Sequence, residues 1–224
     1  MENKYIKLFF AVLAVMLMLL IAFLLGFIIN SGSTQSILGN IQQYQQSVDQ
    51  LQLAASIGNV KSPLSCAVLN SSLLSLSTQL SSIDAAVTAA DLENQSGQQY
   101  TSLIDQLTYA RTDYWLLAQR INEQCNSTFT TVLLFYDPQN CQDCVLEGDY
   151  LSFISSQNKD MIVVAIDRTW NLDIVSVLDR LYNITSSPSI VIDSKYVVHG
   201  YVTTPQILSD LCTDTNQSSF CNQS

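Results

Sequence analysis

The feature that most constrains this chain is the stretch at residues 131–144, TVLLFYDPQNCQDC. Its apolar run, residues 132–136, is short, begins with a β-branched residue and ends at Asp137-Pro138, which predicts a buried strand entering a turn. Cys141-Gln142-Asp143-Cys144 follows at once, and apolar residues then recur at helical spacing, at Val145, Leu146, Leu151 and Ile154. The sequence therefore predicts a helix that opens on C-x-x-C, where unpaired N–H groups and the helix dipole stabilise a thiolate.

From about residue 130 the sequence alternates strand-like and helix-like patterns in the order βαβαββα. The first two strands are joined through a helix, so we expect them to be parallel, and the last two form a hairpin through Ser194-Lys195. The strands are expected at residues 132–136, 161–166, 190–193 and 196–201, and the helices at 141–157, 172–182 and 204–212.

This order, with C-x-x-C opening the first helix and Ser187-Pro188 just before the third strand, resembles the thioredoxin superfamily over about residues 130–212. C-x-x-C alone would also suit a zinc site. The resemblance implies a cis Pro188 that faces the disulfide, with Ser187 offering its backbone to a bound substrate chain. It also implies that Cys141 is the exposed nucleophile and Cys144 the more buried resolving thiol, acting through a mixed disulfide.

The sequence departs from the family pattern around the motif. Phe135 stands where many members carry a buried acid, and Asn140 where they carry Trp, so proton transfer to Cys144 needs water or another group. Gln142-Asp143 replaces the familiar Gly-Pro, Gly-His or Pro-His pair, and a carboxylate between the sulfurs opposes a thiolate. This favours reductase or isomerase-like exchange over strong oxidase behaviour. The competing interpretation is a structural disulfide in a binding domain.

The N-terminal region is continuously apolar over residues 6–29 apart from Lys7 and Gly26, which is long enough to cross a ~30 Å hydrocarbon core as a helix. Lys4 and Lys7 flank its start and the next basic residue is Lys61, which predicts a cytoplasmic N-terminus. The alternative is a cleaved signal peptide, whose apolar region is shorter. We therefore expect residues 1–30 to form a cytoplasmic tip and a single-pass anchor in the cell membrane, with the rest of the chain outside the cytoplasm.

Residues 31–127 carry three apolar stripes with alternating steps of four and three, which predict three helices in an antiparallel bundle or coiled-coil stalk. Ser31-Gly32-Ser33 is expected to be a linker or helix cap ahead of them. Such a stalk offers a surface for docking or for forming a homo-oligomer. The stripes are Ile37, Ile41, Tyr44, Val48, Leu51 and Ala55; Leu69, Leu73, Leu76, Leu80, Ile83, Val87 and Ala90; and Leu103, Leu107, Ala110, Tyr114, Leu117 and Ile121.

Six cysteines permit 15 pairings. Cys66 lies near the start of the second predicted helix and Cys125 just past the third, so an antiparallel hairpin brings them together as a disulfide worth roughly 4 kcal/mol. The alternative is two unrelated buried thiols. Cys212 and Cys221 are expected to form a disulfide that pins the tail of the domain at residues 128–224. A four-sulfur zinc site made with the C-x-x-C is the weaker alternative, so no metal is expected.

The remaining composition excludes several classes of protein. A net charge of -10 with no basic stripe excludes a nucleic-acid partner, and no Gly-rich phosphate loop is present, so no cofactor is expected. His199 is the single histidine and is expected at the surface or at a sheet edge. Three aromatic residues are expected to border the site or to lie in the core: Tyr136, Trp170 and Tyr182.

Six asparagines satisfy the N-x-[ST] pattern and are candidates for glycosylation, the alternative being an Asn/Ser-rich surface without modification. They are Asn70, Asn94, Asn126, Asn183, Asn216 and Asn222.

These patterns together predict a membrane-anchored thiol-disulfide oxidoreductase. Its expected partners are protein thiols and disulfides outside the cytoplasm, the membrane through residues 6–29, and a redox partner in that membrane. The alternatives are a redox-inactive thioredoxin-like interaction module on a helical stalk, and an adaptor whose heptad helices assemble with others.

Overall fold

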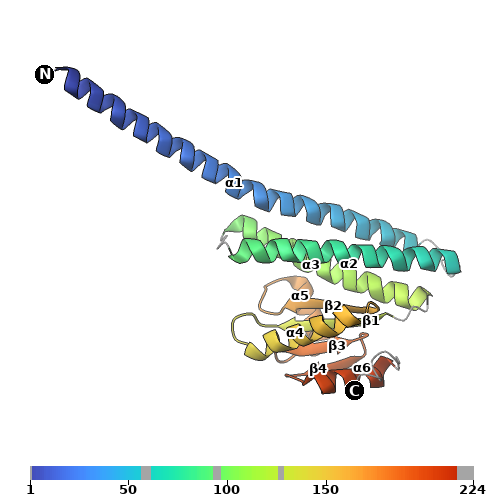
Figure 1. Ribbon diagram of the computed structural model, residues 1–224. Coiled ribbons are helices and arrows are strands. Elements are labelled where there is room, and N and C mark those ends of the chain that lie inside the picture. Colours follow the sequence, from blue (N-terminus) through green and yellow to red (C-terminus); the bar gives the residue numbers. More distant parts are fainter. Residues whose placement is uncertain (1, 57–61, 93–96, 126–128, 216–224) are drawn as a thin grey trace.

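The computed structural model describes residues 2–56, 62–92, 97–125 and 129–215; within these ranges the side chains of residues 2–11, 24–33 and a few residues near helix ends are not described. Three long helices precede a small α/β part (Figure 1). The helices are α1 (Glu2–Ser56), α2 (Pro63–Leu92) and α3 (Gln98–Cys125). The α/β part contains β1 (Thr130–Tyr136), α4 (Gln142–Gln157), β2 (Met161–Asp167), α5 (Asp173–Leu181), β3 (Ser189–Ile192), β4 (Tyr196–His199) and α6 (Thr204–Thr215).

The first element of the predicted fold class is corrected. Within the described part of the chain, no helix is long and apolar enough to cross a membrane. The predicted transmembrane anchor over residues 6–29 is therefore contradicted, and with it the single-pass location in the cell membrane.

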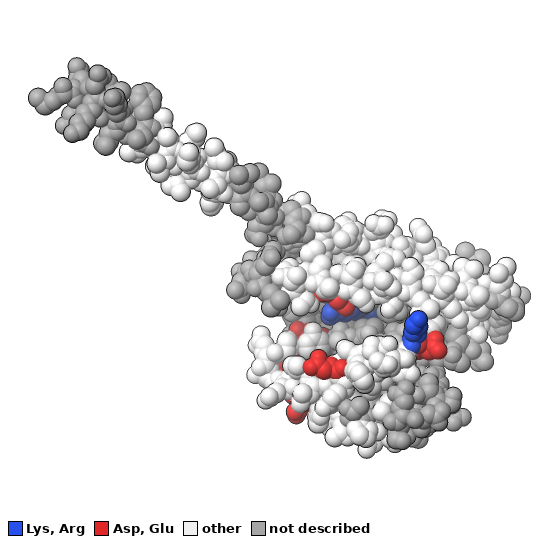
Figure 2. Space-filling view, in the orientation of Figure 1, with Lys and Arg blue, Asp and Glu red and all other residues white. Residues whose placement is uncertain are grey.

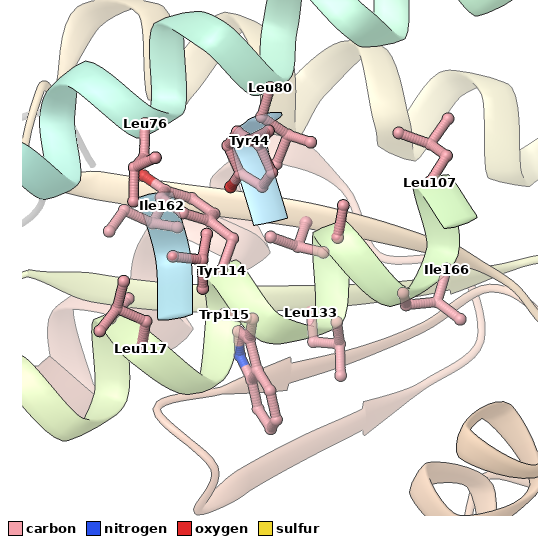
Figure 3. Packing of buried hydrophobic residues seen from close by; sticks show 14 of the residues in the cluster. Tyr44, Leu76, Leu80, Leu107, Tyr114, Trp115, Leu117, Leu133, Ile162 and Ile166 are labelled. Carbon is pink, nitrogen blue, oxygen red and sulfur yellow. The ribbon is translucent and has the colours of Figure 1, made fainter. Parts of the chain in front are cut away.

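The bundle is built by the predicted apolar stripes. Every position of the second and third stripes is buried, and in the first only Leu51 is partly exposed. Tyr44 of α1 meets Leu76 and Leu80 of α2 and Tyr114 of α3 in one apolar cluster (Figure 3). The predicted linker or cap at residues 31–33 is wrong, because α1 runs through it as unbroken helix.

The predicted disulfide between Cys66 and Cys125 is confirmed, with 5.5 Å between the two Cα atoms. It ties the start of α2 to the end of α3, as expected of two antiparallel helices.

The sheet has four strands in the order β2-β1-β3-β4. Strands β1 and β2 are parallel, as the crossover through α4 requires, whereas β3 runs antiparallel to both of its neighbours, β1 and β4. The element order from β1 to α6 matches the predicted βαβαββα. The described part of the chain is mostly helical, and this small mixed sheet lies in its C-terminal half.

Alternation along the strands divides the core into two layers. Leu133 and Phe135 of β1 point to the face that α3 and α5 cover, together with Val191 of β3. Val132 and Leu134 of β1 point to the other face, which α4 and α6 cover through the buried residues Leu151, Ile154, Ile207, Leu208 and Leu211.

Helix α3 belongs to both parts of the molecule. Tyr114 points into the bundle, whereas its neighbour Trp115 points toward the sheet and Leu133 (Figure 3). Arg111 of α3 donates to the backbone oxygen of Ala165 at 3.3 Å, on the outer strand β2. The basic side chains visible in Figure 2 lie along the boundary between the helices and the α/β part. The expected stalk therefore shares one apolar core with the sheet.

Candidate functional site

Cys141 and Cys144 form a disulfide at the N-terminus of α4, with an S–S distance of 1.99 Å and 5.3 Å between Cα atoms. Cys141 is the N-cap residue, and its Sγ accepts a hydrogen bond from the Cys144 backbone N–H at 3.1 Å. Cys141 is half-buried, whereas Cys144 is only 5% exposed. The two sulfurs thus differ in access to solvent, and the more accessible one receives a helix N–H.

The loop that presents the disulfide is fixed by Asp137. One of its carboxylate oxygens accepts hydrogen bonds from the backbone N–H groups of Gln139 at 2.8 Å and Asn140 at 3.0 Å. These bonds to the charged form lower the pKa of Asp137. The side chain stays ionised near neutral pH and holds the turn that leads from β1 into Cys141.

Strand directions gather the other site residues at the same edge of the sheet. The carboxyl end of β1 leads into the C-x-x-C, and Phe135 near that end pairs with Ser189, the first residue of β3. Pro188 precedes Ser189, and the peptide between Ser187 and Pro188 is cis, as the resemblance implies. The disulfide and the cis proline therefore lie at one end of adjacent strands.

The chain around the cis proline is held from both sides. Gly200 donates its N–H to the Pro188 oxygen at 2.9 Å, and its φ of 79° suits a residue without Cβ. Arg168 forms an ion pair with Asp179 at 2.8 Å and donates to the Ile184 oxygen at 2.9 Å, anchoring the segment that leads to Ser187. Within the described chain, no residue hydrogen-bonds to the Ser187 backbone.

Glu147 is a feature of this site that the sequence reasoning missed. It lies one helical turn after Cys144 on the buried face of α4 and is 0% exposed. Burial is the main cause that raises its pKa to about 7; the Val202 N–H lowers the pKa and the Asp143 charge raises it. The available signal was the spacing of Cys144, Glu147, Leu151 and Ile154, which form one face of the helix.

The expected apolar face of α4 is corrected accordingly. Val145 and Leu146 were assigned to it from their spacing, but they are 64% and 44% exposed. Leu151 and Ile154 are buried as predicted. The exposed pair directly follows Cys144, on the outer side of the helix.

A cavity of about 210 Å³ lies between the bundle and the loop that carries the disulfide. Its lining includes Tyr100, Ile104 and Arg111 from α3, together with Tyr136, Pro138 and Trp170 from the α/β part. Arg111 forms an ion pair with Asp84 of α2 at 3.0 Å. Burial raises the pKa of Asp84, and the Arg111 charge opposes that rise.

The predicted aromatic residues divide between these two surroundings. Tyr136 and Trp170 line the cavity, and the Trp170 indole N–H donates to Asp105 of α3 at 2.5 Å. Tyr182 packs edge-on against Trp115, with ring centroids 6.1 Å apart, and so belongs to the core. His199 is exposed on the edge strand β4, as expected, and its Nδ1 lies 3.3 Å from the Ser189 hydroxyl.

Several other predicted residues lie away from this site. Cys212 is disulfide-bonded, but its predicted partner Cys221 lies outside the described residues. Asn70 is half-buried in α2 and Asn183 is exposed just after α5. The other glycosylation candidates, Asn94, Asn126, Asn216 and Asn222, also lie outside the described residues.

Within the described residues, no group of three or more His, Cys, Asp or Glu side chains is placed to hold a metal ion. Comparison of the whole chain with family models, with curated proteins and with solved structures finds no match.

Proposed function

We propose that this protein is a thiol-disulfide oxidoreductase with a thioredoxin-like catalytic part, whose redox pair is Cys141 and Cys144. One observation carries the proposal: the accessible Cys141 sulfur accepts a helix N-terminal N–H, and a cis proline lies at the same end of the sheet. A disulfide that served only to brace the fold would need neither the unequal exposure of its sulfurs nor this placement.

The reductive half of the exchange follows from the positions of the two sulfurs. With the pair reduced, the Cys141 thiolate attacks one sulfur of a partner disulfide, and the other partner sulfur leaves as a thiolate that takes a proton from solvent. Cys144 then loses its proton and attacks the Cys141 sulfur of the mixed disulfide, releasing the second partner thiolate. The protein pair gives up two electrons and two protons, and the partner disulfide receives them.

The role proposed for the proline loop is to hold the partner chain. The Ser187 backbone makes no hydrogen bond within the described chain and precedes the cis proline at the end of β3. An extended partner segment can pair with it as an added strand, which would place a partner sulfur near Cys141. Main-chain pairing of this kind is independent of partner sequence, so it suits a broad range of protein disulfides.

Asp143 bears on the direction of exchange. It lies in the first turn of α4 between the two sulfurs, and its negative charge opposes a thiolate at Cys141. A less stabilised thiolate makes the disulfide less oxidising. Reduction or isomerisation of partner disulfides therefore fits the site better than oxidation of partner thiols.

The test is to trap the intermediate. Reduced Cys144→Ser protein mixed with a disulfide-bonded model peptide should accumulate a mixed disulfide through Cys141, because the resolving thiol is missing. Cys141→Ser protein should form the mixed disulfide far more slowly, because the attacking thiol is missing. Equal rates for these two variants and for a protein with both residues replaced would overturn the proposal.

A second candidate function is partner binding without redox chemistry. Three large apolar side chains of α4 are exposed: Val145 and Leu146, which directly follow Cys144, and Phe153 further along the helix. Such a surface suits a protein contact. In this reading the disulfide braces the start of α4. A partner that binds equally well to wild-type protein and to the Cys141→Ser, Cys144→Ser double variant, with no exchange in either case, would favour it.

A further inference from the structure

Glu147 is a buried carboxylate in the described structure to which no function has been assigned. It is 0% exposed, and neither carboxylate oxygen has a hydrogen-bond partner of ordinary geometry. It follows Cys144 by three residues on the same buried face of α4, and side chains at that spacing are neighbours, with Cβ atoms about 5–6 Å apart. The buried sulfur and the buried carboxylate therefore lie side by side beneath the surface.

The groups that act electrostatically on Glu147 leave its charge uncompensated. From α4 the group is Asp143, whose charge is of the same sign. From the segment after β4 they are Tyr201, which is hydrogen-bonded to Tyr150, and the Val202 N–H. No cation is among the groups that shift its pKa. Burying an unpaired carboxylate is costly, and such a group takes up a proton instead.

Glu147 is also the group best placed to exchange a proton with Cys144. Cys144 is only 5% exposed, so bulk water has little access to its sulfur. Asp143 is exposed and lies in the first turn, where it faces solvent. Phe135 fills the place where a strand acid would stand, and it points to the face of the sheet that α4 does not cover.

We propose that Glu147 is the proton acceptor and donor for Cys144, an inference that rests on the proposed exchange function. When Cys144 attacks the mixed disulfide, its S–H proton passes to the Glu147 carboxylate, and its electron pair forms the bond to Cys141. In the reverse direction a partner thiolate attacks Cys141 and the bond between the two cysteines breaks. Its electron pair goes to the Cys144 sulfur, which takes the proton from the neutral Glu147. The raised pKa of about 7 suits both directions near neutral pH.

The experiment separates the two sulfur steps in the full-length chain. Reduced protein is mixed with 5,5′-dithiobis(2-nitrobenzoate), and two releases of the coloured thiolate are followed from pH 5 to 9. The first reports attack by Cys141, and the second reports attack by Cys144 on the resulting mixed disulfide. In Glu147→Gln the second release should slow about 100-fold at pH 7 and lose its inflection near pH 7, while the first changes little.

The matched control is Asp149→Asn, which removes an exposed carboxylate two residues further along the same helix and should leave both releases unchanged. A second release that is the same in wild type and Glu147→Gln overturns the proposal. Because the reagent is a small disulfide, this result does not depend on whether protein partners are exchanged. Failure of the mixed-disulfide trap with peptides would overturn the proposed function alone.

A second measurement holds even if Glu147→Gln does not fold. The side-chain carboxyl of Glu147, labelled with carbon-13, is titrated by NMR in wild-type protein with the C-x-x-C oxidised and then reduced. A carboxylate that shares a proton with Cys144 should change its pKa by about half a unit or more on reduction, because the neighbouring thiol can then ionise. The same pKa in both states would contradict the proposal.

Discussion

The two disulfides described in this chain have nearly the same span but different surroundings. Cys66 and Cys125 are 5.5 Å apart between Cα atoms and 59 residues apart in sequence; Cys141 and Cys144 are 5.3 Å and 3 residues apart. Closing a long loop restricts the unfolded chain far more than closing a short one. The first disulfide therefore stabilises the helical hairpin, whereas the second contributes little stability and is free to serve chemistry.

The regions around them differ in the same way. The bundle is an apolar seam whose every predicted position in α2 and α3 is buried. The end of the sheet instead brings together the uncompensated carboxylate of Glu147, which costs free energy to bury, the cis peptide at Pro188 and a helix N-terminus capped by the Cys141 sulfur. The bundle is therefore a continuous apolar core, and the sheet end is where the polar and sulfur-bearing groups of the proposed site lie.

The largest effect that separates the two disulfides is on activity. Cys141→Ser should reduce the rate of peptide disulfide exchange to the uncatalysed rate, because the attacking thiolate is lost. The Cys66→Ser, Cys125→Ser double variant should keep the wild-type rate per folded molecule. Both are measured by peptide reduction at 25 °C. A comparable loss of exchange in the two proteins would remove the distinction.

Stability should show the opposite order. Replacing Cys66 and Cys125 together by Ser should lower the free energy of unfolding by about 4 kcal/mol, from the loop that the disulfide closes. The Cys141→Ser, Cys144→Ser variant should lose about 2 kcal/mol or less on the same basis. Urea unfolding followed by circular dichroism measures both. Losses of similar size would mean that loop length does not decide what each disulfide does.

The packing of the buried apolar stripe of α2 can be tested with two neighbouring residues of that helix. Leu73 is 0% exposed and its neighbour Leu74 is 41% exposed, so the two differ in burial but not in residue type. Leu73→Ala should cost about 3 kcal/mol through lost burial and a cavity, and Leu74→Ala less than about 1 kcal/mol. Equal midpoints in urea for the two variants would contradict the packing of α2 against α1 and α3.

The buried carboxylate should make stability depend on pH. Glu147 has its pKa raised in the folded protein from 4.5 to about 7, so the folded state holds the proton more tightly than the unfolded state. Its contribution to stability is therefore greatest below about pH 4.5 and is lost as pH rises through about 7. Glu147→Gln should be more stable than wild type by about 3 kcal/mol at pH 8 and similar near pH 4.

The measurement is chemical unfolding at both pH values, with Asp149→Asn as the control that should follow wild type throughout. A stability difference between Glu147→Gln and wild type that is independent of pH would show that Glu147 does not titrate in this range.

The smallest expected effect concerns the loop before the cis proline. Arg168→Met removes the ion pair with Asp179 and the bond to the Ile184 oxygen, and should cost about 1 kcal/mol because both contacts are half-exposed. Arg180→Met, at an exposed position of α5, should cost almost nothing. Thermal unfolding of the two variants compares them, and an equal loss would remove the anchoring role of Arg168.

Features that depend on residues close together in sequence could be predicted from the sequence. The stripes of α2 and α3 have the helical period, so their buried faces and the meeting of Cys66 with Cys125 followed from geometry. The order of elements from β1 to α6 followed from strand and turn patterns in the same way. The placement of Pro188 beside the C-x-x-C came from the family resemblance.

Contacts between segments far apart in sequence could not be predicted from the sequence. Trp115 and Arg111 lie off the stripe assigned to α3, and only the folded chain shows that they meet the sheet and thereby join the bundle to the α/β part. Glu147 was missed because an acidic residue is ordinarily taken as exposed. The anchor over residues 6–29 was inferred from apolar length alone, and the described part of α1 does not bear it out.

The most direct test of the central claim is the reduction potential of the Cys141 and Cys144 pair in the full-length chain, titrated against dithiothreitol or glutathione with thiol trapping. We expect a value between about -120 and -270 mV, among exchange-active dithiols, with Cys66 and Cys125 still joined at that potential. A potential below about -300 mV would mark the pair as a structural disulfide and would contradict the oxidoreductase function.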